Sequence, residues 1–152
     1  MFLMKQPVSS NRRHQVGYRS GLEDAVAADL KARGVDAPYE PEQIEYTVPC
    51  SKHKYTPDFR LPNGIYIETK GFFTPEDRKK HINVHNSRPD LDIRFVFQNP
   101  HNKLRKGSPT TYAMWCEKNG FLCAAKRVPD AWIKEKTHKK EKLCHGKTAT
   151  KC

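Results

Sequence analysis

Two short apolar stretches separated by a turn place the strongest constraint on the fold. Residues 55–61 read YTPDFRL and residues 65–70 read IYIETK, and Pro62, Asn63 and Gly64 lie between them. Pro, Asn and Gly are favoured in tight turns, and apolar residues at alternate positions are typical of strands. The sequence therefore predicts a β-hairpin at this point.

The hairpin places charged side chains together on one face. With a three-residue loop, Leu61 pairs with Ile65, and the same register sets Asp58 opposite Glu68. Side chains alternate between the faces of a strand, so the apolar residues enter the core while Asp58, Glu68 and Lys70 share the other face. Directly opposed residues have Cβ atoms roughly 4.5–5.5 Å apart. Two carboxylates at that distance repel each other unless a cation lies between them.

The opposed carboxylates predict a divalent metal site. Hard oxygen ligands suit Mg²⁺ or Mn²⁺, and Lys70 could orient a water or stabilise developing negative charge. Two alternatives remain open. The polar side chains could form an ordinary solvent-exposed face, and a two-residue loop would place Asp58 and Glu68 on opposite faces of the hairpin.

The rest of the pattern predicts helices and further strands in one domain. Ser20 is a good N-cap with Glu23 three residues further on, as in a capping box, and Thr74 followed by Pro75 is typical of a helix start. The expected elements are helix 20–33, strands 44–48, 55–61 and 65–70, a helix from 74 that ends before Pro89, strand 92–98, a helix from 108 to 119, and short elements at 121–125 and 129–133. The order α-β-β-β-α-β-α indicates an α/β fold with a mixed sheet.

Basic residues concentrate at the two ends of the chain. The formal net charge is +11, whereas residues 20–133 hold 17 basic and 15 acidic residues. We expect a flexible basic arm at 1–18, a folded domain at 19–133 and a basic, disordered tail at 134–152. Such ends could neutralise phosphates and release counterions, although a solvated surface that aids solubility is the alternative.

The cysteines favour reduced thiols over disulfides or zinc. Their number is odd and no pair has CxxC spacing, and the Cys50–His53 and Cys144–His145 pairs lack the spacing of structural zinc sites. The N-terminus has no apolar core of a secretory signal, and no run approaches the roughly 18 apolar residues of a membrane helix. We expect a cytoplasmic protein. The five cysteines are Cys50, Cys116, Cys123, Cys144 and Cys152.

The hairpin also carries a known nuclease signature. Pro57-Asp58, nine intervening residues and Glu68-Thr69-Lys70 match the PD-(D/E)xK pattern of the restriction-endonuclease-like nucleases. Further matching segments are RSGLED at 19–24, YTPDF at 55–59, LPNG at 61–64, ETKG at 68–71, DRKKH at 77–81, LDIR at 91–94, KGSPT at 106–110 and CEK at 116–118. With these segments, the chain resembles the phage endonuclease I family of Holliday-junction resolvases, over roughly residues 19–133.

The resemblance implies a restriction-endonuclease-like nuclease domain that cleaves branched DNA with Mg²⁺, for which Mn²⁺ can substitute. It assigns Glu23 as a catalytic and metal-binding carboxylate, Asp58 and Glu68 as the metal-binding pair, and Lys70 as the active-site lysine. Family members are intertwined homodimers, which implies that Glu23 serves the partner's site and that residues 46–49 belong to a bridge between two lobes. From the residues alone, a capping role for Glu23 competes, since a carboxylate folded over its own helix start is not expected to reach a metal.

DNA is the implied partner, and clusters of basic residues are the candidates to contact it. Ser108 is included as the expected first residue of a helix, where backbone amides could bind phosphate. His81 could support the site or contact phosphate, and a plain surface histidine is equally compatible. The candidate DNA-contact residues are Arg12, Arg13, Arg19, Arg78, Lys79, Lys80, Lys103, Arg105, Lys106 and Ser108, each of which could also be solvated surface.

Two other functions remain open at this stage. A non-catalytic junction-binding protein would need neither metal nor carboxylates, and a nuclease of the same fold could recognise one duplex sequence. No element of the sequence resembles a helix that reads bases in a major groove. Because phosphate contacts carry little sequence information, we expect weak sequence preference and steep salt dependence.

Overall fold

The computed structural model describes residues 19–48 and 51–136. At its centre lies a sheet of four strands, which are β3 (Phe59–Arg60), β4 (Tyr66–Lys70), β5 (Ile93–Phe97) and β6 (Leu122–Ala125). They follow the order β3-β4-β5-β6. β3 and β4 run antiparallel, whereas β4–β5 and β5–β6 are parallel pairs. The predicted mixed α/β sheet is therefore confirmed.

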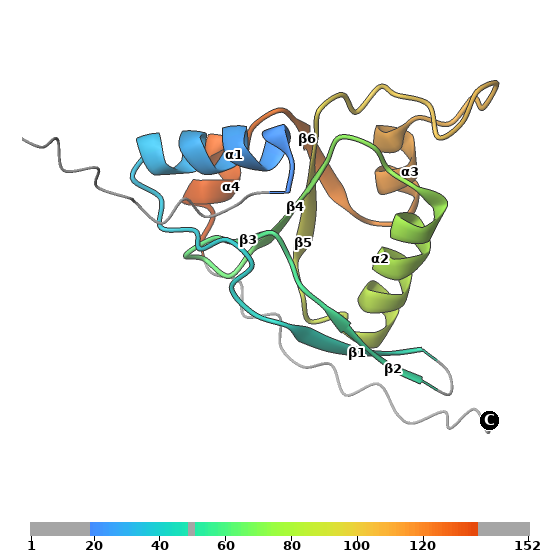
Figure 1. The fold of residues 1–152 in the computed structure, drawn as a ribbon, viewed down its shortest axis with the longest axis horizontal. Helices are drawn as coiled ribbons and strands as arrows, with labels where there is room; N and C mark the ends of the chain where they lie inside the picture. Colours follow the sequence, from blue (N-terminus) through green and yellow to red (C-terminus); the bar gives the residue numbers. More distant parts are fainter. Residues whose placement is uncertain (1–18, 49–50, 137–152) are drawn as a thin grey trace, which may run out of the picture.

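Helices cover both faces of this sheet (Figure 1). One face packs against α1 (Gly21–Ala32) and the short α4 (Asp130–Lys134), and the other packs against α2 (Pro75–Ser87) and α3 (Tyr112–Lys118). Every residue of β5 is buried, as expected for a parallel strand with both faces covered. The same arrangement surrounds β4, so any polar side chain on β4 is held largely away from water.

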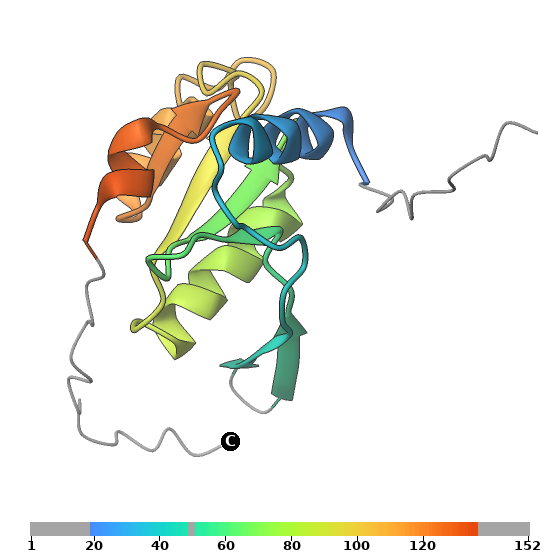
Figure 2. The ribbon, with the colours of Figure 1, turned by 90° about the vertical axis from the view of Figure 1, so that its left-hand side faces the viewer.

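A separate antiparallel pair is formed by β1 (Ile44–Val48) and β2 (Ser51–Tyr55), with Val48 opposite Ser51. Ile44, Tyr46 and Tyr55 from this pair join the apolar cluster that packs under α2. Figure 2 shows the pair at the opposite end of the molecule from α1. The β1–β2 pair thus packs on the α2 side of the main sheet.

The predicted hairpin and its register are confirmed. Phe59 pairs with Ile67, and the backbone N–H of Leu61 donates to the carbonyl of Ile65 at 2.8 Å. Gly64 adopts a φ of +90° in the turn, a conformation that costs glycine little because it has no Cβ. Phe59, Leu61, Ile65 and Ile67 all enter the core on the α1 side, as the alternation predicts.

The prediction of one strand over residues 55–61 is wrong. β2 ends at Tyr55 and β3 begins at Phe59, and the two strands belong to different sheets. Pro57 has no N–H to donate to a ladder, and the carboxylate of Asp58 accepts the N–H of Thr69 at 2.7 Å. The chain therefore joins the main sheet only at Phe59. The first four residues of β2, SKHK, are exposed, so this strand has no apolar alternation by which the sequence could predict it. The observed order is α-β-β-β-β-α-β-α-β-α.

The predicted start of the third helix at Ser108 is also wrong. α3 begins at Tyr112, and its N-cap is Thr111, whose side chain accepts the N–H of Met114. Ser108 instead forms a local turn, in which its hydroxyl accepts the N–H of Thr110 at 3.1 Å. Ser followed by Pro fits a turn as well as a helix start. Ser108 therefore does not offer a helix N-terminus to a phosphate.

The other expected elements are present. The N-cap of α2 is Thr74, with Pro75 at the first position and Asp77 completing a capping box, and α2 ends at Ser87, before Pro89. The short strand and the final helical turn correspond to β6 and α4, although α4 continues to Lys134. None of the described helices combines the length and apolar character needed to cross a bilayer.

Both charged ends lie largely outside the described residues. The structure does not describe the proposed arm at 1–18 or positions 137–152 of the tail. The predicted residues that lie outside the described part are Arg12, Arg13, Cys50, Cys144 and Cys152. The division into arm, domain and tail stays a prediction. Within the described part, Cys116 and Cys123 are free thiols.

Candidate active site

Glu68 lies at the centre of the candidate site, on the third position of β4. Strand alternation directs Ile67 into the α1 cluster and Glu68 toward α2, where its side chain is only 2% exposed. A carboxylate buried to this extent is unfavourable unless donors or cations surround it. The site is built from groups that supply both.

Four side chains surround the Glu68 carboxylate. Oε2 accepts the hydroxyl of Tyr55 at 2.8 Å. Oε1 lies 3.0 Å from Nζ of Lys70, 3.3 Å from Nε2 of His81 and 3.9 Å from Nζ of Lys80. Burial opposes ionisation of Glu68, but the imidazole and the two ammonium groups outweigh it and hold the pKa of the carboxyl below its usual range.

The pKa values of two buried partners of Glu68 are shifted by their surroundings. Burial lowers the pKa of His81, and the charge of Glu68 acts in the opposite direction. Burial and the charge of Glu68 raise the pKa of Tyr55 well above its ordinary value of 10.0. The Tyr55 hydroxyl therefore stays protonated and donates to the carboxylate.

Asp58 supplies the second carboxylate. The register of the hairpin places it one residue before β3, where its Oδ2 accepts the N–H of Thr69 at 2.7 Å and the Thr69 hydroxyl at 2.8 Å. Burial and the negative charge of Glu68 raise the pKa of Asp58 to about 7, although the Thr69 bonds and Lys70 act in the opposite direction. The two acids are thus close enough to repel each other. A divalent cation bound by both would remove that repulsion, so this donor set fits the predicted hard metal.

Lys70 completes the predicted group on β4. Its Nζ lies 3.0 Å from Glu68 and 3.5 Å from Oδ1 of Asp77. Burial would lower the pKa of Lys70, but the charges of Glu68, Asp77 and Asp58 outweigh it and raise the pKa above its usual range. Lys70 is therefore an ammonium at neutral pH. In that state it can stabilise negative charge on a phosphate, but it cannot accept a proton from water.

Three residues at the site come from one face of α2. Asp77, Lys80 and His81 recur at helical spacing and point toward the end of β4, and Asp77 is also 3.9 Å from Lys80. Sequence reasoning assigned Lys80 to DNA and left His81 open, and it missed Asp77 as a partner of Lys70. The i, i+3, i+4 spacing of these residues could have indicated a shared face. Tyr55 was missed as well, because its strand was not predicted.

Glu23 has a different environment within its own chain. The side chain is 7% exposed, and Oε2 accepts the N–H of Arg19 at 2.8 Å and the hydroxyl of Tyr39 at 2.7 Å. The N–H of Glu23 itself donates to the Ser20 hydroxyl, so the N-cap predicted at Ser20 is confirmed. The carboxylate of Glu23 accepts from Arg19 rather than from Ser20, so it does not complete a capping box. Nowhere in residues 19–48 and 51–136 do three His, Cys, Asp or Glu side chains gather to hold a metal. The expected three-carboxylate set is therefore not assembled within one chain.

Tyr39 connects Glu23 to the neighbourhood of Asp58. The rings of Tyr39 and Phe59 lie 5.4 Å apart, and their backbones form an isolated bridge. The N–H of Glu40 donates to the carbonyl of Asp58 at 2.7 Å. Segment 19–48 thus docks directly beside the residue that carries the second carboxylate.

The candidate DNA-contact residues fall into two groups. The side chain of Arg19 pairs with Glu40, Arg78 donates to the carbonyl of Phe73 at 3.0 Å, and Lys80 faces Glu68 and Asp77. These side chains have partners in the protein. Arg19 is nevertheless exposed to solvent, and the other exposed members are Lys79, Lys103, Arg105 and Lys106.

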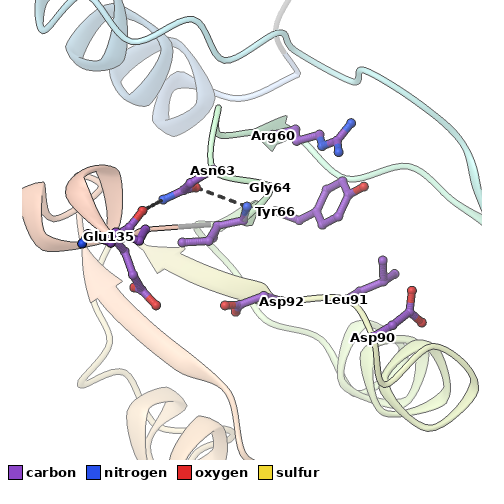
Figure 3. A pocket seen from close by; sticks show the side chains of 10 residues that line it. Arg60, Asn63, Gly64, Tyr66, Asp90, Leu91, Asp92 and Glu135 are labelled. Carbon is purple, nitrogen blue, oxygen red and sulfur yellow. Dashed lines mark hydrogen bonds between the residues drawn. The ribbon is translucent and has the colours of Figure 1, made fainter. Parts of the chain in front are cut away.

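A separate pocket of about 200 Å³ lies at the other end of β4 (Figure 3). Tyr66, the hairpin turn and the segment before β5 line it. Two of its carboxylates, those of Asp92 and Glu135, are paired with Arg94 at 2.7 Å. This pairing compensates the acidic charge at the pocket, which is not part of the candidate active site.

Comparison with known proteins identifies the family. The family described as Phage endonuclease I matches residues 4–151. Endodeoxyribonuclease 1 of Enterobacteria phage T3 is 53% identical over 118 residues, which cover 78% of each chain. Endonuclease I of Escherichia phage T7 is 51% identical over 118 residues, covering 78% of this chain and 79% of the phage T7 protein. The chain carrying this cluster of Asp58, Glu68 and Lys70 belongs to the phage endonuclease I family.

Proposed function

We propose that this protein is a Mg²⁺-dependent endodeoxyribonuclease that cleaves branched DNA, including Holliday junctions, by hydrolysis of phosphodiester bonds. The observation that carries the proposal is the pair of interacting carboxylates, Asp58 and Glu68, with the ammonium group of Lys70 beside them. The names and the identity of the phage T3 and T7 relatives support endonuclease activity on DNA. Mn²⁺ would substitute for Mg²⁺, because both are divalent ions that accept oxygen ligands.

Each residue of the site has a distinct part in this chemistry. Asp58 and Glu68 would hold the metal, which when bound supplies a Lewis acid for the attacking and leaving oxygens. Lys70, fixed between Glu68 and Asp77, presents a permanent positive charge to the scissile phosphate. Thr69 holds Asp58 in place through two hydrogen bonds. The site therefore offers positioning and charge stabilisation, which are the main requirements of phosphodiester hydrolysis.

The proposal includes an intertwined homodimer in which Glu23 completes the partner's site. β1 and β2 are adjacent strands of one antiparallel pair, and an exchange at the connection between them would carry segment 19–48 to a second copy. The exchanged segment would make the same contacts with the partner, including those near Asp58. Such exchange is a low-cost route to a dimer because it reuses existing contacts. It would also give two linked active sites, as a four-way junction requires.

Selectivity for branched DNA would arise from shape rather than base reading. The exposed basic residues Lys103, Arg105 and Lys106 lie on the loop before α3, where they are suited to phosphate contacts. Binding through such contacts weakens steeply with salt. The arms at 1–18 and 134–152 would add to this attraction by their charge.

Cleavage of a four-way junction tests the proposal directly. The protein is incubated with the junction in Mg²⁺ and in EDTA, with linear duplexes of the four arm sequences as controls. We expect paired cuts near the branch point in Mg²⁺ only. Cutting that persists in EDTA would refute the metal dependence, and binding without cutting would instead support a non-catalytic junction-binding protein. Equal cutting of a linear duplex at a fixed sequence would support a sequence-specific nuclease.

A further inference from the structure

Two buried side chains that have no part in the proposed chemistry, those of Tyr55 and His81, lie next to the Glu68 carboxylate. Tyr55, on β2, is 1% exposed and donates its hydroxyl to Oε2 at 2.8 Å. His81, on α2, is 0% exposed and places Nε2 3.3 Å from Oε1. Each oxygen of the carboxylate thus faces a donor from a different element.

The environment of His81 is otherwise that of an apolar residue. Its ring packs edge-on against Phe95 at 4.8 Å and against Tyr55 at 5.3 Å. Neither ring nitrogen has a well-aligned hydrogen bond, and Nε2 only approaches Glu68. A leucine or phenylalanine would fill this position without leaving a buried polar group unsatisfied, and such a group calls for an explanation. The adjacent carboxylate supplies one.

We propose that Tyr55 and His81 are positioning residues that fix the orientation of Glu68 for metal binding. Tyr55 restrains Oε2, and the Nε2–H of His81 restrains Oε1. The carboxylate would then keep one orientation when a cation binds. Hydrogen bonds to a ligating carboxylate commonly change metal affinity by 10–100-fold. This inference rests on the proposed function, because it takes Glu68 as a metal ligand.

The two restraints also connect the metal site to distant parts of the fold. Tyr55 is the last residue of β2, and segment 19–48 would be exchanged at the connection before this strand. His81 lies on the face of α2 that also presents Asp77 to Lys70. Loss of either restraint would leave Lys70 bound to Glu68 but would free the carboxylate to rotate. The expected defect is therefore in metal affinity rather than in DNA affinity.

Mn²⁺ binding to the full chain without DNA provides the test, measured by calorimetry or by loss of the free-ion paramagnetic resonance signal. Tyr55→Phe removes only the hydroxyl, His81→Leu removes the polar ring, and His81→Gln restores an N–H donor. Tyr66→Phe is the matched control, because Tyr66 donates to the carboxylate of Glu42 at the same 2.8 Å, outside the site. We expect Tyr55→Phe and His81→Leu to weaken Mn²⁺ binding by about 10-fold or more. His81→Gln should recover much of the loss, and Tyr66→Phe should bind like the parent protein.

The outcomes separate this inference from the proposed function. Glu68→Ala is the reference: if the parent protein does not bind Mn²⁺, or Glu68→Ala binds it equally well, the proposed metal site itself fails. If Glu68→Ala abolishes binding but Tyr55→Phe and His81→Leu bind like the parent, the positioning role is refuted. Thermal unfolding and junction binding in EDTA are measured in parallel. A Tyr55→Phe protein that is less stable but has unchanged Mn²⁺ affinity would show a structural role only and would overturn the inference.

Discussion

Replacing Asp58 by Asn should make the metal-free protein more stable at neutral and alkaline pH. The folded protein raises the pKa of Asp58 from 3.8 to about 7, so folding favours the protonated acid. Each pKa unit corresponds to about 1.4 kcal/mol. The contribution of Asp58 to the free energy of unfolding is fully present below pH 4 and decreases as the pH rises to 7. The full shift corresponds to about 4 kcal/mol. Because Asp58 keeps partial contact with water, we expect about 2–4 kcal/mol.

Asparagine resembles the protonated acid in shape and cannot ionise. Its side-chain oxygen can still accept the N–H and the hydroxyl of Thr69. Urea unfolding in EDTA, at one protein concentration, should therefore give a stability gain for Asp58→Asn that is small at pH 4.5 and grows toward pH 8. Asp36→Asn, at an exposed position, is the control and should show no such trend. Added Mn²⁺ should stabilise the parent protein but not Asp58→Asn.

The result that would refute this reasoning is a stability difference that does not change between pH 4.5 and pH 8. It would mean that Asp58 is not destabilised by burial and by Glu68. An Asp58→Asn protein that is less stable than the parent at both values would point to a structural carboxylate. Either outcome would remove the electrostatic argument for a cation between the two acids.

Three further predictions concern catalysis, DNA binding and assembly. Lys70→Ala should lower junction cleavage by about 10²–10³-fold, while junction affinity in EDTA changes little. Equal loss of cleavage and affinity would indicate a binding role. Lys118→Ala, at an exposed position on α3, serves as the control. Replacing Lys103, Arg105 and Lys106 by Ala together should reduce the salt dependence of junction binding by up to about three phosphate contacts, and an unchanged slope in a log–log titration would exclude this loop from the interface. Refolding a mixture of Glu23→Ala and Lys70→Ala chains should restore part of the activity if segment 19–48 is exchanged, whereas inactive heterodimers of verified composition would exclude a shared site.

The sequence predicts the β4 part of the site because that part depends on local rules. The alternation along residues 65–70 and the turn at Gly64 determine which side chains share a face. A contact from a distant element could change this only by shifting the register of the strand by one residue. Asp58, Glu68 and Lys70 therefore lie where the pattern predicts, on and beside one hairpin. The N-caps at Ser20 and Thr74 are equally local and are found as predicted.

The rest of the site depends on contacts between elements, which no local pattern specifies. Tyr55 reaches Glu68 only because the chain changes sheets between β2 and β3, a change that depends on Pro57 and on the side chain of Asp58. His81 reaches Glu68 only because α2 crosses over the face of β4. The error at Ser108 has the same origin, since a serine before a proline satisfies a turn and a helix start alike. A local pattern therefore predicts which side chains share one face of a helix or strand. It does not predict which other element packs against that face.

Glu23 shows how two interpretations that compete in the sequence can be compatible in the structure. Folding over its own helix start was expected to keep the carboxylate from a metal. Both of its donors, Arg19 and Tyr39, bind Oε2, so Oε1 is the oxygen with which Glu23 would reach a cation. Both donors also belong to segment 19–48, so an exchanged segment would carry the oriented carboxylate as a unit. The contacts from Arg19 and Tyr39 would then act as the restraint that a ligand on a transferred segment needs, much as Tyr55 is proposed to restrain Glu68.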